Sequence, residues 1–147
     1  MLERGELTYV NADTELAGRL MAAAQQHLVS AGLLADSDPY LAYSAIHDAI
    51  RKALSALLQV QGLRPTTAGG HLAVSQAVHA QFGASMGTIL RPIDRIRTTR
   101  HSAEYPGPTT YIDPDTVRQD LPKAEAVIEA TAKALPHLPV FIADRSG

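Results

Sequence analysis

Hydrophobic residues recur at intervals of three and four along most of the chain, the spacing that places them on one face of an α-helix. Asp, Gly and Pro residues interrupt this pattern at points where helices usually start or stop. Short loops between such segments favour antiparallel neighbours, so we expect an all-α fold, an up-and-down bundle of about five helices. The pattern predicts these helices over about residues 14–31, 39–61, 71–82, 89–104 and 115–135.

The segment between Pro39 and Gly62 carries the clearest helical pattern. Its polar face has a stripe in steps of four, formed by Tyr43, His47 and Arg51 and continued by a serine. An amphipathic helix of this kind buries its apolar face and leaves the other face to solvent or a partner. The apolar positions are Ile46, Ile50, Ala53, Leu54, Leu57 and Leu58.

Glycine and proline positions set the expected limits of the other helices. Gly32 stands where a glycine just past the last turn would end the first helix. Pro92 is compatible with the fourth helix only within its first turn. Pro122 either kinks the fifth helix or splits it, and a split would make Asp120 the cap of the second half.

Length and composition fit one helical domain. The chain has 147 residues, of which 46% are hydrophobic and 5% aromatic, with no tryptophan. A core built largely from Ala and Leu favours helices over a β-sandwich or barrel, and no two segments form a convincing strand pair. We expect an N-terminal arm or brief strand over residues 1–12, a helical domain over 13–139 and a C-terminal tail over 140–147.

Charge and residue types exclude several classes of protein. The formal net charge is −2, so any affinity for nucleic acid has to come from a local patch. The absence of cysteine excludes a disulfide framework, a thiolate metal site and a cysteine nucleophile. No metal-ligand spacing and no glycine-rich nucleotide motif occurs, so we expect no metal and no cofactor. Without an apolar run of membrane length or a signal peptide, we expect a cytoplasmic protein.

Arginine is concentrated in one short segment. Four of the 13 Lys and Arg residues stand at Arg91, Arg95, Arg97 and Arg100, and His101 follows directly. On a helix, residues 97, 100 and 101 share one side, away from the apolar positions. The planar fork of Arg donates two hydrogen bonds to phosphate, so this strip predicts an anion site. The alternative is a solvated helix face whose charges favour the helix dipole and solubility.

His47 is the second candidate, because it lies with Arg51 on the polar stripe of the second helix. If this stripe faces the arginine strip, both residues help to hold a phosphate or a base. The alternative is a surface stripe, stabilised by an ion pair between Asp48 and Lys52 one turn apart.

Several short motifs follow one another along the chain. They are AYSAIHDA at 42–49, QGLRP at 61–65, GH at 70–71, RIRTTRHSAEYP at 95–106 and LPKA at 121–124. This ordered set resembles the HEPN superfamily of prokaryotic helical domains, in particular its small stand-alone bacterial members. The resemblance covers residues 13–136.

The resemblance implies a helical bundle that dimerises through the helices that bear the motif. Many similar domains are metal-independent ribonucleases, toxins of toxin–antitoxin or phage-defence systems that are often encoded beside a nucleotidyltransferase. In these domains an Arg binds the scissile phosphate, and a His a few residues later is the general acid/base while the ribose 2′-OH attacks. If Arg95 is the motif Arg, His101 follows after a gap of five residues; if Arg100 is, Tyr105 stands near the place of the His.

The leading hypothesis is a homodimeric HEPN-like domain that binds RNA or a nucleotide, with cleavage of RNA as a possible activity. Its catalytic residues would be His101 with Arg100 or Arg95. Its phosphate- and RNA-binding residues would be Arg97, Arg91, His47, Arg51 and Tyr105.

Two other hypotheses compete with this one. The first is a non-catalytic module that binds a nucleotide or pairs with a nucleotidyltransferase, antitoxin or toxin partner. The second is a helical dimer in which the arginine strip forms salt bridges across the subunit interface. Acids available for such bridges are Asp113, Asp115 and Glu104.

Overall fold

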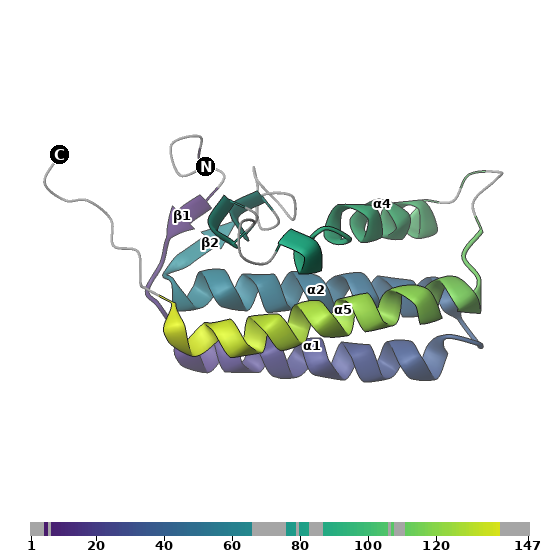
Figure 1. Ribbon diagram of the computed structural model, residues 1–147, viewed down its shortest axis with the longest axis horizontal. Helices are drawn as coiled ribbons and strands as arrows, with labels where there is room; N and C mark the ends of the chain where they lie inside the picture. The colour runs from purple at the N-terminus through teal and green to yellow at the C-terminus, as the bar shows by residue number, and fades with distance from the viewer. Residues whose placement is uncertain are drawn as a thin grey trace, which may run out of the picture.

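The computed structural model describes residues 5, 7–65, 76–78, 80–82, 87–105, 107 and 111–138. Three long helices lie side by side, and a shorter helix lies along the outer side of α2 (Figure 1). Successive members of this set run in opposite directions (Figure 1), which confirms the all-α, up-and-down prediction. The helices are α1 (Thr14–Leu34), α2 (Pro39–Val60), α4 (Ile93–Glu104) and α5 (Pro114–Ala134).

The described residues of the predicted third helix, 76–78 and 80–82, are helical. Residues 71–75 of that prediction lie outside the described residues, and so does the expected tail over 140–147. After α5, the chain continues as the short 3₁₀ helix η1 (Leu135–His137).

Each of the three long helices begins after an aspartate that accepts a hydrogen bond from the backbone N–H three residues later. The aspartates are Asp13, Asp38 and Asp113, with distances of 2.9, 3.1 and 2.8 Å. Pro39 and Pro114 then occupy the first helical position, where the missing N–H of proline costs nothing. These caps place the helix starts within one or two residues of the predicted positions.

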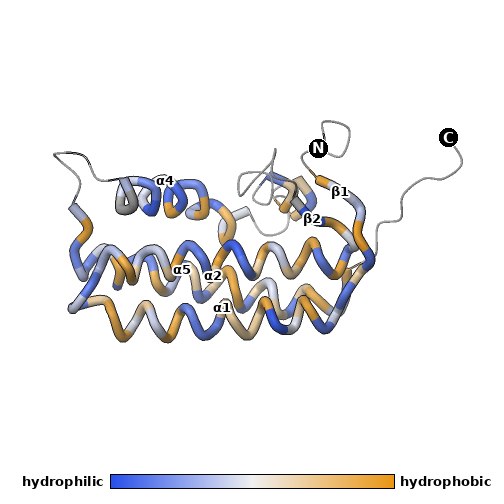
Figure 2. Tube along the Cα trace, turned by 180° about the vertical axis from the view of Figure 1, so that it is seen from behind, coloured by the Kyte–Doolittle hydropathy of each residue, from blue (hydrophilic) through white to orange (hydrophobic). Residues whose placement is uncertain are grey.

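The core lies around α2, which packs against α1, α4 and α5. Its predicted apolar face is buried, as Ile46, Leu54 and Leu57 show. Alanines on α1 and α2 form a second apolar cluster with Ile128 of α5, and their small side chains allow close helix packing. Hydrophobic and hydrophilic positions alternate along the long helices, whereas α4 is largely hydrophilic (Figure 2).

The first helix does not end at Gly32, as the sequence suggested, but continues to Leu34. Gly32 does not have the positive φ of a helix-ending glycine. Ala31 and Ala35 are both buried, so the apolar face of the helix extends past the glycine. Packing of that extended face explains why the helix runs on.

The expectation that no strands pair was wrong. β1 (Leu7–Tyr9) and β2 (Leu63–Pro65) form an antiparallel pair. Gly62 has a φ of +79°, which directs the chain out of α2 and into β2, and its carbonyl accepts a hydrogen bond from Val10 N–H at 2.8 Å. Three-residue strands are too short to show an alternating pattern, so the sequence carried little signal for them.

Two prolines differ in their effect on the helices: Pro92 interrupts a predicted helix, whereas Pro122 lies within one. The predicted helix over 89–104 is interrupted: residues 87–90 are helical, 91–92 form a turn, and α4 starts after Pro92. The proline ring is incompatible with the carbonyl four residues earlier in a continuous helix, which explains the break. Pro122, by contrast, lies inside an unbroken α5, so it does not split the helix and Asp120 is not a cap.

Candidate nucleic-acid interface

The α4 helix presents two faces of opposite character. Ile93 and Ile96 are buried and attach the helix to the core. Arg97 and Arg100, outside this buried contact, are half-buried, and His101 is exposed. The cationic and apolar residues of α4 therefore lie on different faces, as predicted. Some of the cationic side chains are partly covered by the protein.

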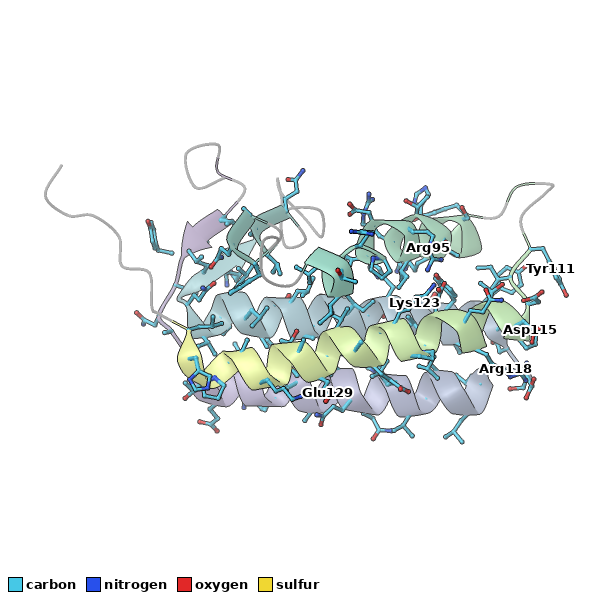
Figure 3. The ribbon with its side chains drawn as sticks, viewed as in Figure 1. Arg95, Tyr111, Asp115, Arg118, Lys123 and Glu129 are labelled. Carbon is cyan, nitrogen blue, oxygen red and sulfur yellow. The ribbon has the colours of Figure 1, made fainter. Side chains whose placement is uncertain are left out.

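Arg95 makes the most specific contact of the strip, with Asp120 of α5. Arg95 Nη2 donates to Asp120 Oδ1 at 2.5 Å, and Nη1 donates to Oδ2 at 2.9 Å. Tyr43 of α2 donates its hydroxyl to the same Oδ2 at 2.5 Å, and Lys123 Nζ lies 3.5 Å from Oδ1. Arg95 and Lys123 lie close together where α4 passes α5 (Figure 3).

The electrostatics of this cluster agree with its geometry. Burial works to raise the pKa of the Asp120 carboxyl, but hydrogen bonds from Arg95 and Tyr43 lower that pKa below its ordinary value. Burial and the bond to Asp120 together raise the pKa of the Tyr43 phenol far above 10. Asp120 is therefore ionised and Tyr43 protonated at neutral pH. The ion pair between Arg95 and Asp120 therefore forms within one chain and needs no second subunit.

The polar stripe of α2 is not a surface stripe at its N-terminal end. Tyr43 is fully buried, and only 6% of His47 is exposed. Asp48 and Lys52, both in the described part of the chain, do not form the expected ion pair. Lys52 Nζ instead donates to His27 Nε2 of α1 at 2.6 Å. Packing of α1 on this side of α2 gives Lys52 a nearer partner.

Charges from α2 and α4 meet around Asp48. The Asp48 Oδ1 atom lies 3.8 Å from both His47 Nδ1 and Arg51 Nε. The neighbouring His47, together with the positive charges of Arg51 and Arg100, lowers the pKa of the Asp48 carboxyl. Arg97 precedes Arg100 by about one turn on α4, and within the described part of the chain its buried Nε has no hydrogen-bond acceptor. We call Arg51, Arg97 and Arg100 the cation cluster.

His101 and Tyr105 form a pair at the end of α4. Their ring centroids are 4.9 Å apart, with the planes tilted by 44°. Tyr105 is the capping residue of α4 and is largely exposed. Both side chains are therefore accessible to a ligand in this chain.

The predicted site residues thus separate into groups. Arg51 and Arg100 meet around Asp48, beside His47, and His101 contacts Tyr105. Arg95 turns toward α5, and Arg91 is exposed in the turn before α4. Arg100 of α4 therefore acts on an acid of α2, and the interpretation of His47 as a second wall stays a prediction.

Sequence reasoning missed Asp120 and Lys123 as parts of this region, and it placed Tyr43 on a polar stripe without foreseeing its burial. A signal was available for two of them. Asp120 falls in register with Val117 and Ala124, which are buried on the apolar face of α5. Tyr43 likewise precedes the buried Ile46 by three residues. A polar residue in an apolar register indicates a buried partner.

Two of the three acids expected to pair with arginine across a subunit interface have partners within the chain, and the side chain of Glu104 lies outside the described part of the structure. Asp113 caps α5 and accepts from Thr116. Asp115 pairs with Arg118, which also contacts Asp36 at the turn between α1 and α2. Salt bridges between subunits stay a prediction.

Within the described residues, no group of three or more His, Asp or Glu side chains is arranged to hold a metal ion. No helix in the same part of the chain is long and apolar enough to span a membrane.

The chain matches the model of one protein family. The model of the HEPN domain matches residues 17–135, from the first turn of α1 to the end of α5. No curated protein sequence and no solved structure matches the chain at a significant level.

Proposed function

The chain belongs to the HEPN domain family, and from this premise we propose that it binds RNA or a nucleotide on the surface formed by α2 and α4. Membership supports a HEPN-type ribonuclease or nucleotide-binding module in general. The observation that carries the proposal is that Arg51 of α2 lies 3.8 Å from Asp48, whose pKa the positive charge of Arg100 on α4 also lowers. Arg97 adds a third guanidinium to this surface.

A phosphate group suits this surface for two physical reasons. Guanidinium forks match phosphate oxygens in geometry and remain charged at any physiological pH. Several such groups on rigid helices also lose little conformational entropy when a ligand binds. Arg51 and Arg100 both act on the single carboxylate of Asp48, so two positive charges accompany one negative charge at this point of the surface.

Of the two arginines that fit the family motif, we assign Arg100 as the phosphate ligand. Both terminal nitrogens of Arg95 already donate to Asp120. Tyr105 then stands near the place of the motif His, in ring contact with His101. A nucleotide base can stack on this exposed aromatic pair while its phosphate contacts the cation cluster.

Metal-independent RNA cleavage is the second candidate function, and the accessible His101 one turn after Arg97 favours it. In this reaction His101 would take the proton of the ribose 2′-OH as that oxygen attacks phosphorus. The bond to the 5′-oxygen of the next nucleotide breaks, and that oxygen receives a proton. Removing a general acid/base lowers such a rate by about 10²–10⁴-fold.

The alternative is a non-catalytic module that pairs with a nucleotidyltransferase, an antitoxin or a toxin. Tyr105 in the place of the motif His favours this alternative, because an ordinary phenol is a poor base at neutral pH. In both cases we propose that the protein acts as a homodimer, as the family resemblance implies, and that it does so in the cytoplasm.

The first test measures binding and cleavage of a mixed-sequence RNA by the purified protein in EDTA. The variants are Arg100→Ala and His101→Ala, and Arg118→Ala is the matched control, because Arg118 pairs with Asp36 and Asp115 away from α4. We expect Arg100→Ala to weaken RNA binding and the control to bind like wild type. Loss of cleavage in His101→Ala with binding retained supports the ribonuclease. Absence of both binding and cleavage in the wild type contradicts the proposed function.

A further inference from the structure

The Asp120 carboxylate is the most completely enclosed charge near the proposed site. We propose that Asp120 is a positioning residue: it holds Arg95, and with it α4, against α2 and α5, and it keeps the Arg95 guanidinium out of the group that contacts phosphate. The second part of this inference rests on the proposed function. The first part concerns the attachment of α4 and does not depend on any ligand.

Burial makes the Asp120 contacts obligatory. The residue is only 2% exposed, and an isolated carboxylate in such a place would be strongly disfavoured. Its two oxygens accept three hydrogen bonds, two from Arg95 and one from Tyr43. Removing one partner of a buried pair leaves a charge without compensation, so these bonds are held strongly.

The three partners come from three different helices. Tyr43 belongs to α2, Arg95 to α4 and Asp120 to α5. Since α4 packs mainly on α2, the Arg95 fork links it to α5 as well. Thr99, one turn after Arg95, also lies beside the Tyr43 hydroxyl. The link therefore restricts how α4 slides or rotates on the bundle.

The position of this link matters for the cation cluster. His47 follows Tyr43 by one helical turn on α2, and Arg100 follows Arg95 by five residues on α4. A shift of α4 at Arg95 would move Arg97 and Arg100 relative to Arg51. Asp120 thus sets the geometry of a site that it does not itself enter.

The same contacts determine which arginines are available to a ligand. Both terminal nitrogens of Arg95 already bind a carboxylate in the bidentate geometry that a phosphate would use. A phosphate would have to displace Asp120, which would leave that buried charge without its main partner. Within the described residues, Arg97 makes no such bidentate pair with a buried acid.

The test uses the full chain with Asp120→Asn, Arg95→Met and the double variant. Asp115→Asn is the matched control, because it makes the same change on the same helix at a carboxylate that is 79% exposed. Without RNA, hydrogen exchange of the α4 amides reports how firmly the helix is held. We expect the α4 amides to exchange about tenfold faster in Asp120→Asn and in Arg95→Met, because each variant loses a hydrogen bond to a charged group. We expect no change in the control. The double variant should exchange no faster than either single variant.

Binding of a labelled single-stranded oligoribonucleotide across a series of salt concentrations tests the second part. Arg100→Met should lower the slope of log K against log salt by about 0.7, the value for one phosphate contact on a single strand. Arg95→Met should leave that slope unchanged, although its affinity falls. A general loss of stability would not separate these two variants in this way.

Two results would overturn the inference. One is α4 exchange in Asp120→Asn and Arg95→Met that equals exchange in Asp115→Asn. The other is a salt slope that falls in Arg95→Met as much as in Arg100→Met, which would make Arg95 a phosphate ligand. If a single variant does not fold, the double variant provides both measurements, because it leaves no unpaired charge at the buried position. If the wild type binds no RNA, the proposed function fails and the exchange measurement alone decides whether Asp120 holds α4.

Discussion

Replacing Tyr43 with Phe removes one hydroxyl group from the buried side of α2 and leaves the ring in place. The lost bond is a donation to the ionised Asp120 at 2.5 Å. A hydrogen bond to a charged group contributes about 1.5–3 kcal/mol to stability, and a bond between neutral groups contributes about 1 kcal/mol. Because the pair is fully enclosed and Asp120 keeps its bonds to Arg95, we expect a loss of about 2 kcal/mol in the free energy of unfolding.

Tyr40→Phe is the matched control for this change. Tyr40 belongs to the same helix, is partly buried, and its hydroxyl accepts a long hydrogen bond of 3.4 Å from Ile112 N–H. A bond of this length is weak, so we expect a loss of less than about 1 kcal/mol.

Urea denaturation followed by circular dichroism at pH 7 measures both variants, with the slope m checked for constancy. A loss of 2 kcal/mol corresponds to a decrease of about 4–8 °C in Tm for a domain of this size. The loss for Tyr43→Phe should shrink when Asp120 is replaced by Asn, because the charge that strengthens the bond is then absent. Equal losses for Tyr43→Phe and Tyr40→Phe would refute the assignment of a charge-assisted bond to Tyr43.

Two further predictions concern the scaffold. Burial and the nearby Lys52 lower the pKa of His27, so the imidazole binds a proton more readily in the unfolded chain than in the folded one. The free energy of unfolding should therefore fall as the pH drops from 7 through the ordinary His pKa of 6.5. His27→Gln should reduce that fall in urea titrations at several pH values. Leu57→Ala, in the fully buried centre of α2, should lower the free energy of unfolding by about 2–5 kcal/mol in urea denaturation. Leu33→Ala, at a position that is 78% exposed, should lower it by less than about 0.5 kcal/mol. Equal losses would contradict the central place of α2.

The fold was largely predictable because its signals are local. Asp38 followed by Pro39 favours a helix start through a cap that involves only neighbouring residues, and the caps of α1 and α5 act through the same short-range hydrogen bonds. The errors arose where a distant contact overrides a local preference. Gly32 stays helical because the face around it packs on other helices, and β1 pairs with a strand that follows it by more than fifty residues.

The candidate site was predictable only in part. The arginine strip is visible as a local excess of one residue type, so Arg97, Arg100 and His101 could be singled out from the sequence. The sequence does not reveal which arginine has an acidic partner. Arg95 and Arg100 are equivalent candidates in the motif, and only the packing of α5 brings Asp120 to one of them.

The antiparallel pair of β1 and β2 has a consequence for how the chain folds. It joins residues 7–9 to residues 63–65 and so closes the hairpin of α1 and α2 into one contiguous unit. Most contacts within this unit are between neighbouring elements, which favours fast folding. On a ribosome these residues emerge before α4 and α5 have been synthesised, and domains tend to fold from the N-terminal side. We therefore expect the hairpin to form early and to serve as the template on which α4 and α5 then pack.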